Sequence, residues 1–132
     1  MNENRVARVR DNLARRGLTQ ALIVDPLSIW WLCGYYTEPY ERFLALLLPA
    51  EGTPTLFANR LFPDAGGCGA RVVEFSDTDD PVALVAEATD RSRALGVDKE
   101  LAARWLVPLM EAGAASSFVL ASDAVDDARS IK

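Results

Sequence analysis

Two apolar runs separated by a short polar segment constrain the fold of this chain more than any other feature. The first run occupies residues 43–48, directly after Arg42, and the second occupies residues 55–58, with Pro49-Ala-Glu-Gly52 between them. This pattern predicts an antiparallel hairpin, because a short polar connection containing Gly lets neighbouring strands reverse direction. A purely parallel sheet would not contain such a hairpin, so the sheet is expected to be mixed.

The rest of the chain alternates helical and extended segments. We expect helices at 4–16, 26–32, 81–93 and 101–111 and the opening of another at 126–132, and further strands at 20–24, 71–75, 94–97 and 117–121, with 61–69 as a glycine-rich connection. Gly17 ends the first helix, and Asp-Pro pairs at 25–26 and 80–81 open two others. This order predicts the α/β class: a three-layer mixed sheet of about six strands flanked by helices. No internal linker divides residues 1–132, so we expect a single domain.

Composition narrows the classes of partner. The 132 residues are 50% apolar and 25% charged, as in a soluble globular domain, and the net charge of −5 disfavours nucleic-acid binding. Arginines cluster within residues 1–17, but Val6, Val9 and Leu13 recur at helical spacing, which places the arginines on the solvated side of an amphipathic helix; a basic arm is the alternative. The longest apolar run is far shorter than the roughly 20 residues that span a bilayer, so no membrane association is expected.

Histidine is absent from the sequence. A Ser-His-Asp triad, a Cys-His pair and a histidine zinc site are therefore all excluded. The chain has two cysteines, Cys33 and Cys68, without CxxC spacing, which fits a reducing, cytoplasmic setting.

Aspartates follow several of the predicted strands. Asp25, Asp77 and Asp98 each come directly after an apolar run or within two residues of it. Carboxylates at the carboxyl ends of strands can hold magnesium for phosphoryl transfer, which gives one hypothesis: a free-standing α/β domain with nuclease-like or receiver-like chemistry. The competing interpretation, which we prefer, is that Asp25, Asp80 and Asp98 cap helix starts.

Aromatic residues gather in one short stretch, at Trp30, Trp31, Tyr35, Tyr36, Tyr40 and Phe43. The segment from Tyr35 to Arg42 is typical of a loop, so several of its rings are expected at the surface, where they would form a binding edge or an oligomer interface. Trp30 and Trp31 are expected mainly to pack.

Several segments together resemble a known family. They are Arg5 to Gly17, Ala21 to Tyr35, Pro49 to Gly52 with Asn59-Arg60, and the closing Asp127-Ala-Arg-Ser-Ile-Lys132. They are similar to the amino-terminal domain of the creatinase, prolidase and aminopeptidase P family, in which a helix of the type "R...L...G.D" precedes a strand and a segment "N..YLTGY" follows it. Leu32, Gly34 and Tyr35 match the second motif, whereas Ser28, Trp31 and Cys33 replace its Asn, Tyr and Thr.

The resemblance implies a non-catalytic role for residues 1–132. In the family, a pita-bread catalytic domain with two Asp, one His and two Glu ligands holds a pair of divalent metals, which would be manganese, cobalt or zinc, and that domain would follow Lys132. The resemblance also implies a homodimer or higher oligomer and a proline-containing peptide substrate of the full-length Xaa-Pro peptidase. Tyr35, with Tyr36, Tyr40 and Arg42 as further candidates, would line the substrate entrance of a neighbouring subunit. No catalytic or metal-binding residue is predicted in this chain.

Overall fold

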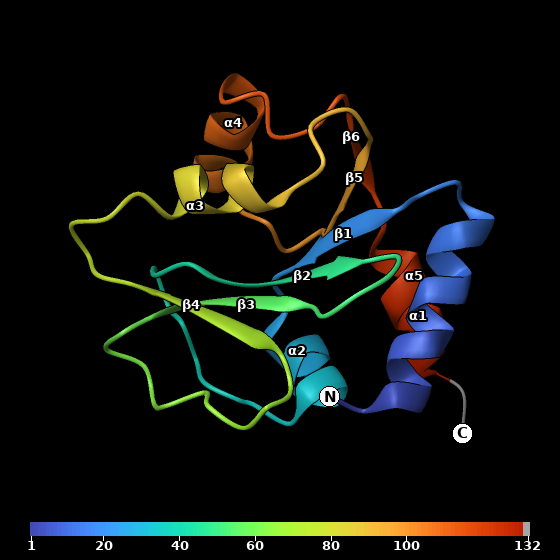
Figure 1. Cartoon of the computed structure of the whole chain (residues 1–132), viewed down its shortest axis with the longest axis horizontal. Coiled ribbons are helices and arrows are strands. Elements are labelled where there is room, and N and C mark those ends of the chain that lie inside the picture. Colours follow the sequence, from blue (N-terminus) through green and yellow to red (C-terminus); the bar gives the residue numbers. More distant parts are fainter. Residues whose placement is uncertain (131–132) are drawn as a thin grey trace.

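A computed structural model describes residues 1–130. Its helices are α1 (Glu3–Arg15), α2 (Pro26–Cys33), α3 (Pro81–Ala88), α4 (Ala103–Glu111) and α5 (Ser122–Arg129), and its strands are β1 (Gln20–Ile23), β2 (Leu44–Pro49), β3 (Thr55–Asn59), β4 (Arg71–Phe75), β5 (Leu95–Val97) and β6 (Phe118–Leu120) (Figure 1). None of these helices is long and apolar enough to cross a membrane.

The strands form one six-stranded sheet in the order β4-β3-β2-β1-β5-β6. Strand β2 runs antiparallel to both of its neighbours, with Leu44 opposite Ala58 on β3 and Ile23 of β1 opposite Leu46. The other pairings, β1 with β5, β3 with β4 and β5 with β6, are parallel. The predicted hairpin and the mixed sheet are therefore confirmed.

Helices cover both faces of the sheet (Figure 1). Helices α1, α2 and α5 pack on one face, and α3 and α4 pack on the other, each over its own apolar cluster. Strand β2 shows how one strand serves both clusters, because Leu44, Leu46 and Leu48 lie in the first and Ala45 and Leu47 in the second. Side chains alternate between the faces of a strand, so a continuous apolar run is what a strand buried on both sides requires. The three-layer α/β prediction is confirmed.

Two helix boundaries differ from the prediction by more than two residues. Helix α3 ends at Ala88 rather than near residue 93, because Thr89 takes an extended conformation and its hydroxyl donates to Ala114 O at 2.6 Å. Helix α5 begins at Ser122, earlier than residue 126, since its first turns already pack on α1 through Ala124, whose carbonyl accepts a hydrogen bond from the Asn12 side chain at 2.9 Å. Both boundaries are set by distant residues. The predicted continuation to residue 132 includes residues 131–132, which lie outside the described residues.

Candidate functional site

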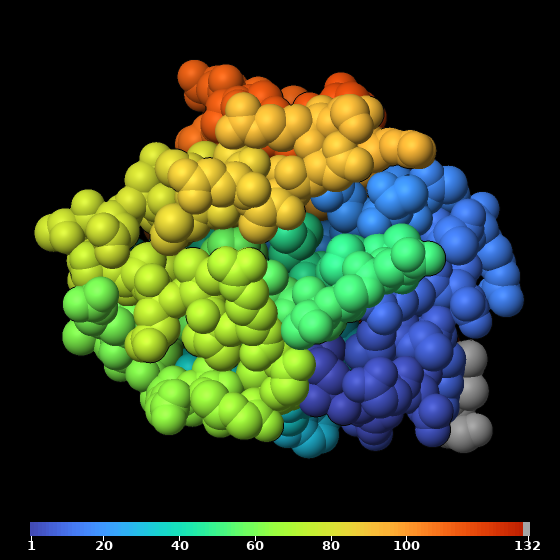
Figure 2. All heavy atoms as spheres, viewed as in Figure 1, coloured from blue at the N-terminus to red at the C-terminus, as the bar shows by residue number. Residues whose placement is uncertain are grey.

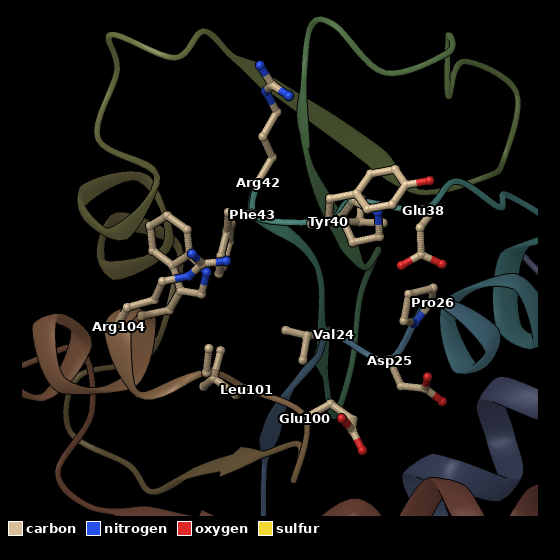
Figure 3. A pocket seen from close by; sticks show the side chains of 14 residues that line it. Val24, Asp25, Pro26, Glu38, Tyr40, Arg42, Phe43, Glu100, Leu101 and Arg104 are labelled. Carbon is tan, nitrogen blue, oxygen red and sulfur yellow. The ribbon is translucent and has the colours of Figure 1, made fainter.

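The candidate site is a pocket of about 250 Å³ where strands β1 and β5 end (Figure 3). Because β2 is antiparallel to β1, it begins where β1 ends, and the segment 35–43 that leads into β2 therefore crosses this edge of the sheet. The turn 98–102 and the start of α4 form the opposite wall. The pocket is lined by Val24, Asp25, Pro26, Glu38, Pro39, Tyr40, Arg42, Phe43, Leu44, Glu100, Leu101, Ala102, Arg104 and Trp105.

The lining combines apolar and charged side chains. Figure 3 shows the carboxylates of Glu38 and Glu100 on one side of the pocket and the Arg104 side chain on the other. Phe43 packs edge-on against Trp105 with ring centroids 5.2 Å apart, and the Arg104 guanidinium lies 5.4 Å from the centroid of the Trp105 ring. Arg104 also donates to Glu41 O at 2.8 Å, which ties α4 to the segment before β2. Such a pocket can hold a small molecule that has both an apolar part and charged ends.

Tyr35 is part of the core, contrary to the expectation that it lies at the surface. Its side chain is only 8% exposed, and its hydroxyl donates to Pro63 O at 2.7 Å. Burial raises the pKa of this phenol, and the nearby Asp64 carboxylate adds to the effect. Tyr35 therefore fixes the segment after α2 to the connection between β3 and β4, and it does not line the pocket.

Tyr36 and Tyr40 are exposed, as the sequence predicts. Tyr36 is 50% exposed and its hydroxyl donates to Glu38 Oε2 at 3.2 Å, a hydrogen bond that raises the pKa of the phenol. Tyr40 is 83% exposed and lines the pocket. Its φ of +52° is the only positive value at a non-glycine residue among residues 1–130. A bulky residue in the left-handed region costs about 1–2 kcal/mol, so the chain holds this ring in place against a local conformational preference.

Arg42 belongs to a charged network beside the pocket. Its guanidinium makes two hydrogen bonds to Asp77, at 3.1 Å and 3.0 Å, and Asn59 donates to the same carboxylate at 2.7 Å. These donors, Arg42 first, lower the pKa of Asp77 below its usual value. In Figure 3 the Arg42 side chain points away from the carboxylates of Glu38 and Glu100. Its hydrogen bonds to Asp77 therefore hold the segment 35–43 in place, and its guanidinium does not face the cavity.

The aspartates considered as magnesium ligands are each used structurally. Asp98 accepts the backbone N–H groups of Val24, Asp25 and Glu100 at 3.2, 3.0 and 3.0 Å. Asp25 accepts from Arg129 Nη1 at 3.1 Å and from Ser28 Oγ at 2.8 Å.

The capping interpretation is confirmed for Asp80, whose side chain accepts from Val82 N at 3.0 Å. It is wrong for the side chain of Asp25, which makes no cap bond although the residue occupies the N-cap of α2. It is also wrong for Asp98, because the next helix, α4, begins at Ala103 with Ala102 as its N-cap. Within residues 1–130, no group of three or more His, Cys, Asp or Glu side chains is placed to hold a metal ion.

The paired tryptophans divide between surface and core. Trp31 packs against the core, as predicted. The Arg5 guanidinium also lies over its ring, 5.0 Å from the centroid. Trp30 is 50% exposed, so the prediction that it mainly packs is wrong. Successive positions of a helix face about 100° apart, so α2 turns Trp31 toward Arg5 of α1 and leaves Trp30 in solvent.

Sequence reasoning missed Glu38, Glu100, Arg104 and Trp105 as pocket residues. Glu38 lay inside the aromatic stretch but carried no motif of its own. The other three come from a part of the chain about sixty residues further on, and only the sheet order places them beside residues 38–43. No local signal in the sequence could have found them.

The fold is shared with solved dipeptidases. A proline dipeptidase of Streptococcus pneumoniae superposes with a TM-score of 0.83 and 23% identity over 96% of this chain and 98% of that one. A dipeptidase of Mycobacterium ulcerans superposes with a TM-score of 0.81 and 30% identity over 98% of this chain but 37% of its own. An uncharacterised peptidase of Staphylococcus aureus is 27% identical over 90 residues, which are 66% of this chain and 26% of the relative. The chain thus spans about a quarter of the length of the curated relatives that it matches.

Fold and topology define an α/β domain of the kind that occurs in peptidases of the prolidase type. The model of the creatinase/prolidase N-terminal domain matches residues 5–131, and the chain belongs to that family. The resemblance seen in the sequence is confirmed.

Proposed function

We propose that this chain is the non-catalytic N-terminal domain of a cytoplasmic Xaa-Pro dipeptidase-like metallopeptidase. The observation that carries the proposal is the family match over residues 5–131 in a chain that covers only 26% of a curated peptidase relative. The remaining length of such relatives leaves room for a catalytic domain holding two divalent metals (manganese, cobalt or zinc), for which residues 1–130 contain no ligand group. The free thiols of Cys33 and Cys68 are compatible with the cytoplasm.

The pocket at the ends of β1 and β5 supports a role at the substrate entrance of a neighbouring subunit in a homodimer or higher oligomer. Tyr40 offers an exposed ring at its rim, and a rigid aromatic face suits the apolar ring of a proline-containing peptide. Glu38 and Glu100 offer carboxylates to a peptide ammonium, and Arg104 offers a guanidinium to a peptide carboxylate. Tyr36 and Arg42 position this segment, and Tyr35 anchors it from the core.

The test is steady-state hydrolysis of a Xaa-Pro dipeptide by the full-length protein with manganese. Tyr40→Ala should lower kcat/KM by about tenfold, which corresponds to about 1.4 kcal/mol of transition-state binding. Leu120→Ala is the matched control, because Leu120 is also a large exposed apolar side chain, 73% accessible, on the edge strand β6. Residues 1–132 alone should give no turnover.

Equal kcat/KM for Tyr40→Ala and the parent would remove the entrance role. Metal-dependent turnover by residues 1–132 alone would contradict the non-catalytic assignment.

A further inference from the structure

The two cysteines of the chain, 35 positions apart in the sequence, lie on neighbouring segments of the folded domain. Cys33 is the last residue of α2, and Cys68 lies in the glycine-rich connection between β3 and β4. Both are free thiols of intermediate burial, and both pack against the same core cluster, the one beneath α1, α2 and α5.

Backbone contacts hold the two segments together. Asn2 N donates to Leu32 O at 2.7 Å, next to Cys33, and the Met1 nitrogen donates to Cys68 O at 2.5 Å. Two consecutive residues at the start of the chain thus bind the backbone beside each thiol. Figure 2 shows the connection that contains Cys68 lying against these first residues of the chain. The hydrogen bond from the Tyr35 hydroxyl to Pro63 O also joins the segment after α2 to the connection between β3 and β4.

The two thiols also interact. Burial raises the pKa of the Cys33 thiol, and the Cys68 side chain raises it further. Each thiol also adds to the raised pKa of the Tyr35 phenol.

We propose that Cys33 and Cys68 are a redox-active pair that closes to an intramolecular disulfide when a hydroperoxide reaches the domain. Because the raised pKa of Cys33 disfavours its thiolate, the thiolate of Cys68 attacks the peroxide, so that an S–O bond forms and the O–O bond breaks, releasing an alcohol, or water when the oxidant is hydrogen peroxide. The second thiolate attacks the resulting sulfenic sulfur, an S–S bond forms, and the S–O bond breaks with release of water. Two electrons pass from the sulfurs to the peroxide, and a thiol reductant reverses the change.

The geometry around Cys68 suits this closure. Gly67 and Gly69, which flank Cys68, each have a φ of +88°, a region that glycine adopts without strain, so the connection can adjust to the Cβ separation that a disulfide demands. The new bond would tie the end of α2, and with it the segment that carries Tyr36 and Tyr40, to the β3–β4 connection. Formation of the bond does not depend on the proposed peptidase role.

The experiment treats the reduced protein with a small excess of hydrogen peroxide, blocks remaining thiols with iodoacetamide, and maps tryptic peptides by mass spectrometry without reductant. Cleavage after arginine places Cys33 in peptide 17–42 and Cys68 in peptide 61–71. The expected product joins these two peptides with a loss of two hydrogens, in monomeric protein. It should disappear after dithiothreitol, and the oxidised protein should melt at a higher temperature than the reduced one.

Cys33→Ser and Cys68→Ser are the matched controls, in which the remaining cysteine should stop at a sulfenic acid or be oxidised further. If a variant fails to fold, the peptide map of the oxidised parent protein still shows whether the disulfide forms. Two alkylated thiols after peroxide, sulfinic acid on a single cysteine, or only intermolecular cross-links would each overturn the proposal.

Discussion

Removing the Tyr35 hydroxyl separates its hydrogen bond from its packing. Tyr35→Phe deletes the 2.7 Å hydrogen bond to Pro63 O while leaving the buried ring in place. A buried hydrogen bond contributes about 1 kcal/mol net, so the free energy of unfolding should fall by about that amount. In a chain of 132 residues this corresponds to a decrease in Tm of about 3–5 °C.

Tyr35→Ala removes the ring as well. Because the side chain is 8% exposed, the cost should approach that of a buried aromatic, about 3–5 kcal/mol, which a small domain barely tolerates. Tyr36→Phe and Tyr36→Ala are matched controls at a 50% exposed position, where changes of within about 0.5 kcal/mol are expected.

The measurement is urea unfolding followed by tryptophan fluorescence, with calorimetry for Tm. If Tyr35→Ala unfolds at the same urea concentration as Tyr36→Ala, then Tyr35 is not a core residue and its assignment as an anchor fails. If Tyr35→Phe costs as much as Tyr35→Ala, the hydrogen bond rather than the packing dominates.

Three further predictions concern backbone strain, close packing and charge. Tyr40→Gly should raise Tm slightly or leave it unchanged, because glycine removes the strain at φ +52°; a marked loss of stability by calorimetry would contradict strain at this site. Gly96→Ala should destabilise by about 1–3 kcal/mol, since its Cβ would lie 2.8 Å from that of Ala121; unchanged urea unfolding would show that the strand can shift. Arg42→Ala should raise the pKa of Asp77 in an NMR titration, because Arg42 is the main cause of its lowered value. The stabilising effect of Asp77 is present above its unfolded pKa and disappears as the pH falls through the lower folded one, so acid unfolding of Arg42→Ala should begin at higher pH, and an unchanged titration would refute the pairing.

Local chemistry was sufficient for much of the fold. The hairpin followed from two apolar runs and a short polar turn, and the start of α3 followed from Asp80-Pro81, where the carboxylate caps the helix. The end of α3 did not follow, since it depends on Thr89 reaching Ala114 and on Gln20 Oε1 accepting from Asp90 N at 2.8 Å. These partners lie 25 and 70 positions away in the sequence, beyond the reach of any periodicity.

The aromatic segment at the candidate site also combines a part that the local sequence predicts with a part that tertiary contacts determine. Tyr35, Tyr36 and Tyr40 have similar neighbours in the sequence, yet their exposures are 8%, 50% and 83%. What separates them is tertiary: Tyr35 finds a carbonyl on the β3–β4 connection, whereas Tyr40 has a left-handed backbone that turns its ring outward. Composition could predict an aromatic edge but not which ring occupies it.

Strands β2 and β3 keep two of the strand-end carboxylates, those of Asp25 and Asp77, apart. Asp77 follows β4, whereas Asp25 follows β1, and β3 and β2 lie between those strands in the sheet. Three interstrand spacings of about 4.8 Å separate the two strand ends by about 14 Å, too far for one metal ion to bind both carboxylates. Each carboxylate is instead satisfied locally, Asp77 by Arg42 and Asp25 by Arg129. The pocket at this edge of the sheet is therefore lined by apolar and charged side chains and not by a shared metal-binding cluster of Asp25 and Asp77.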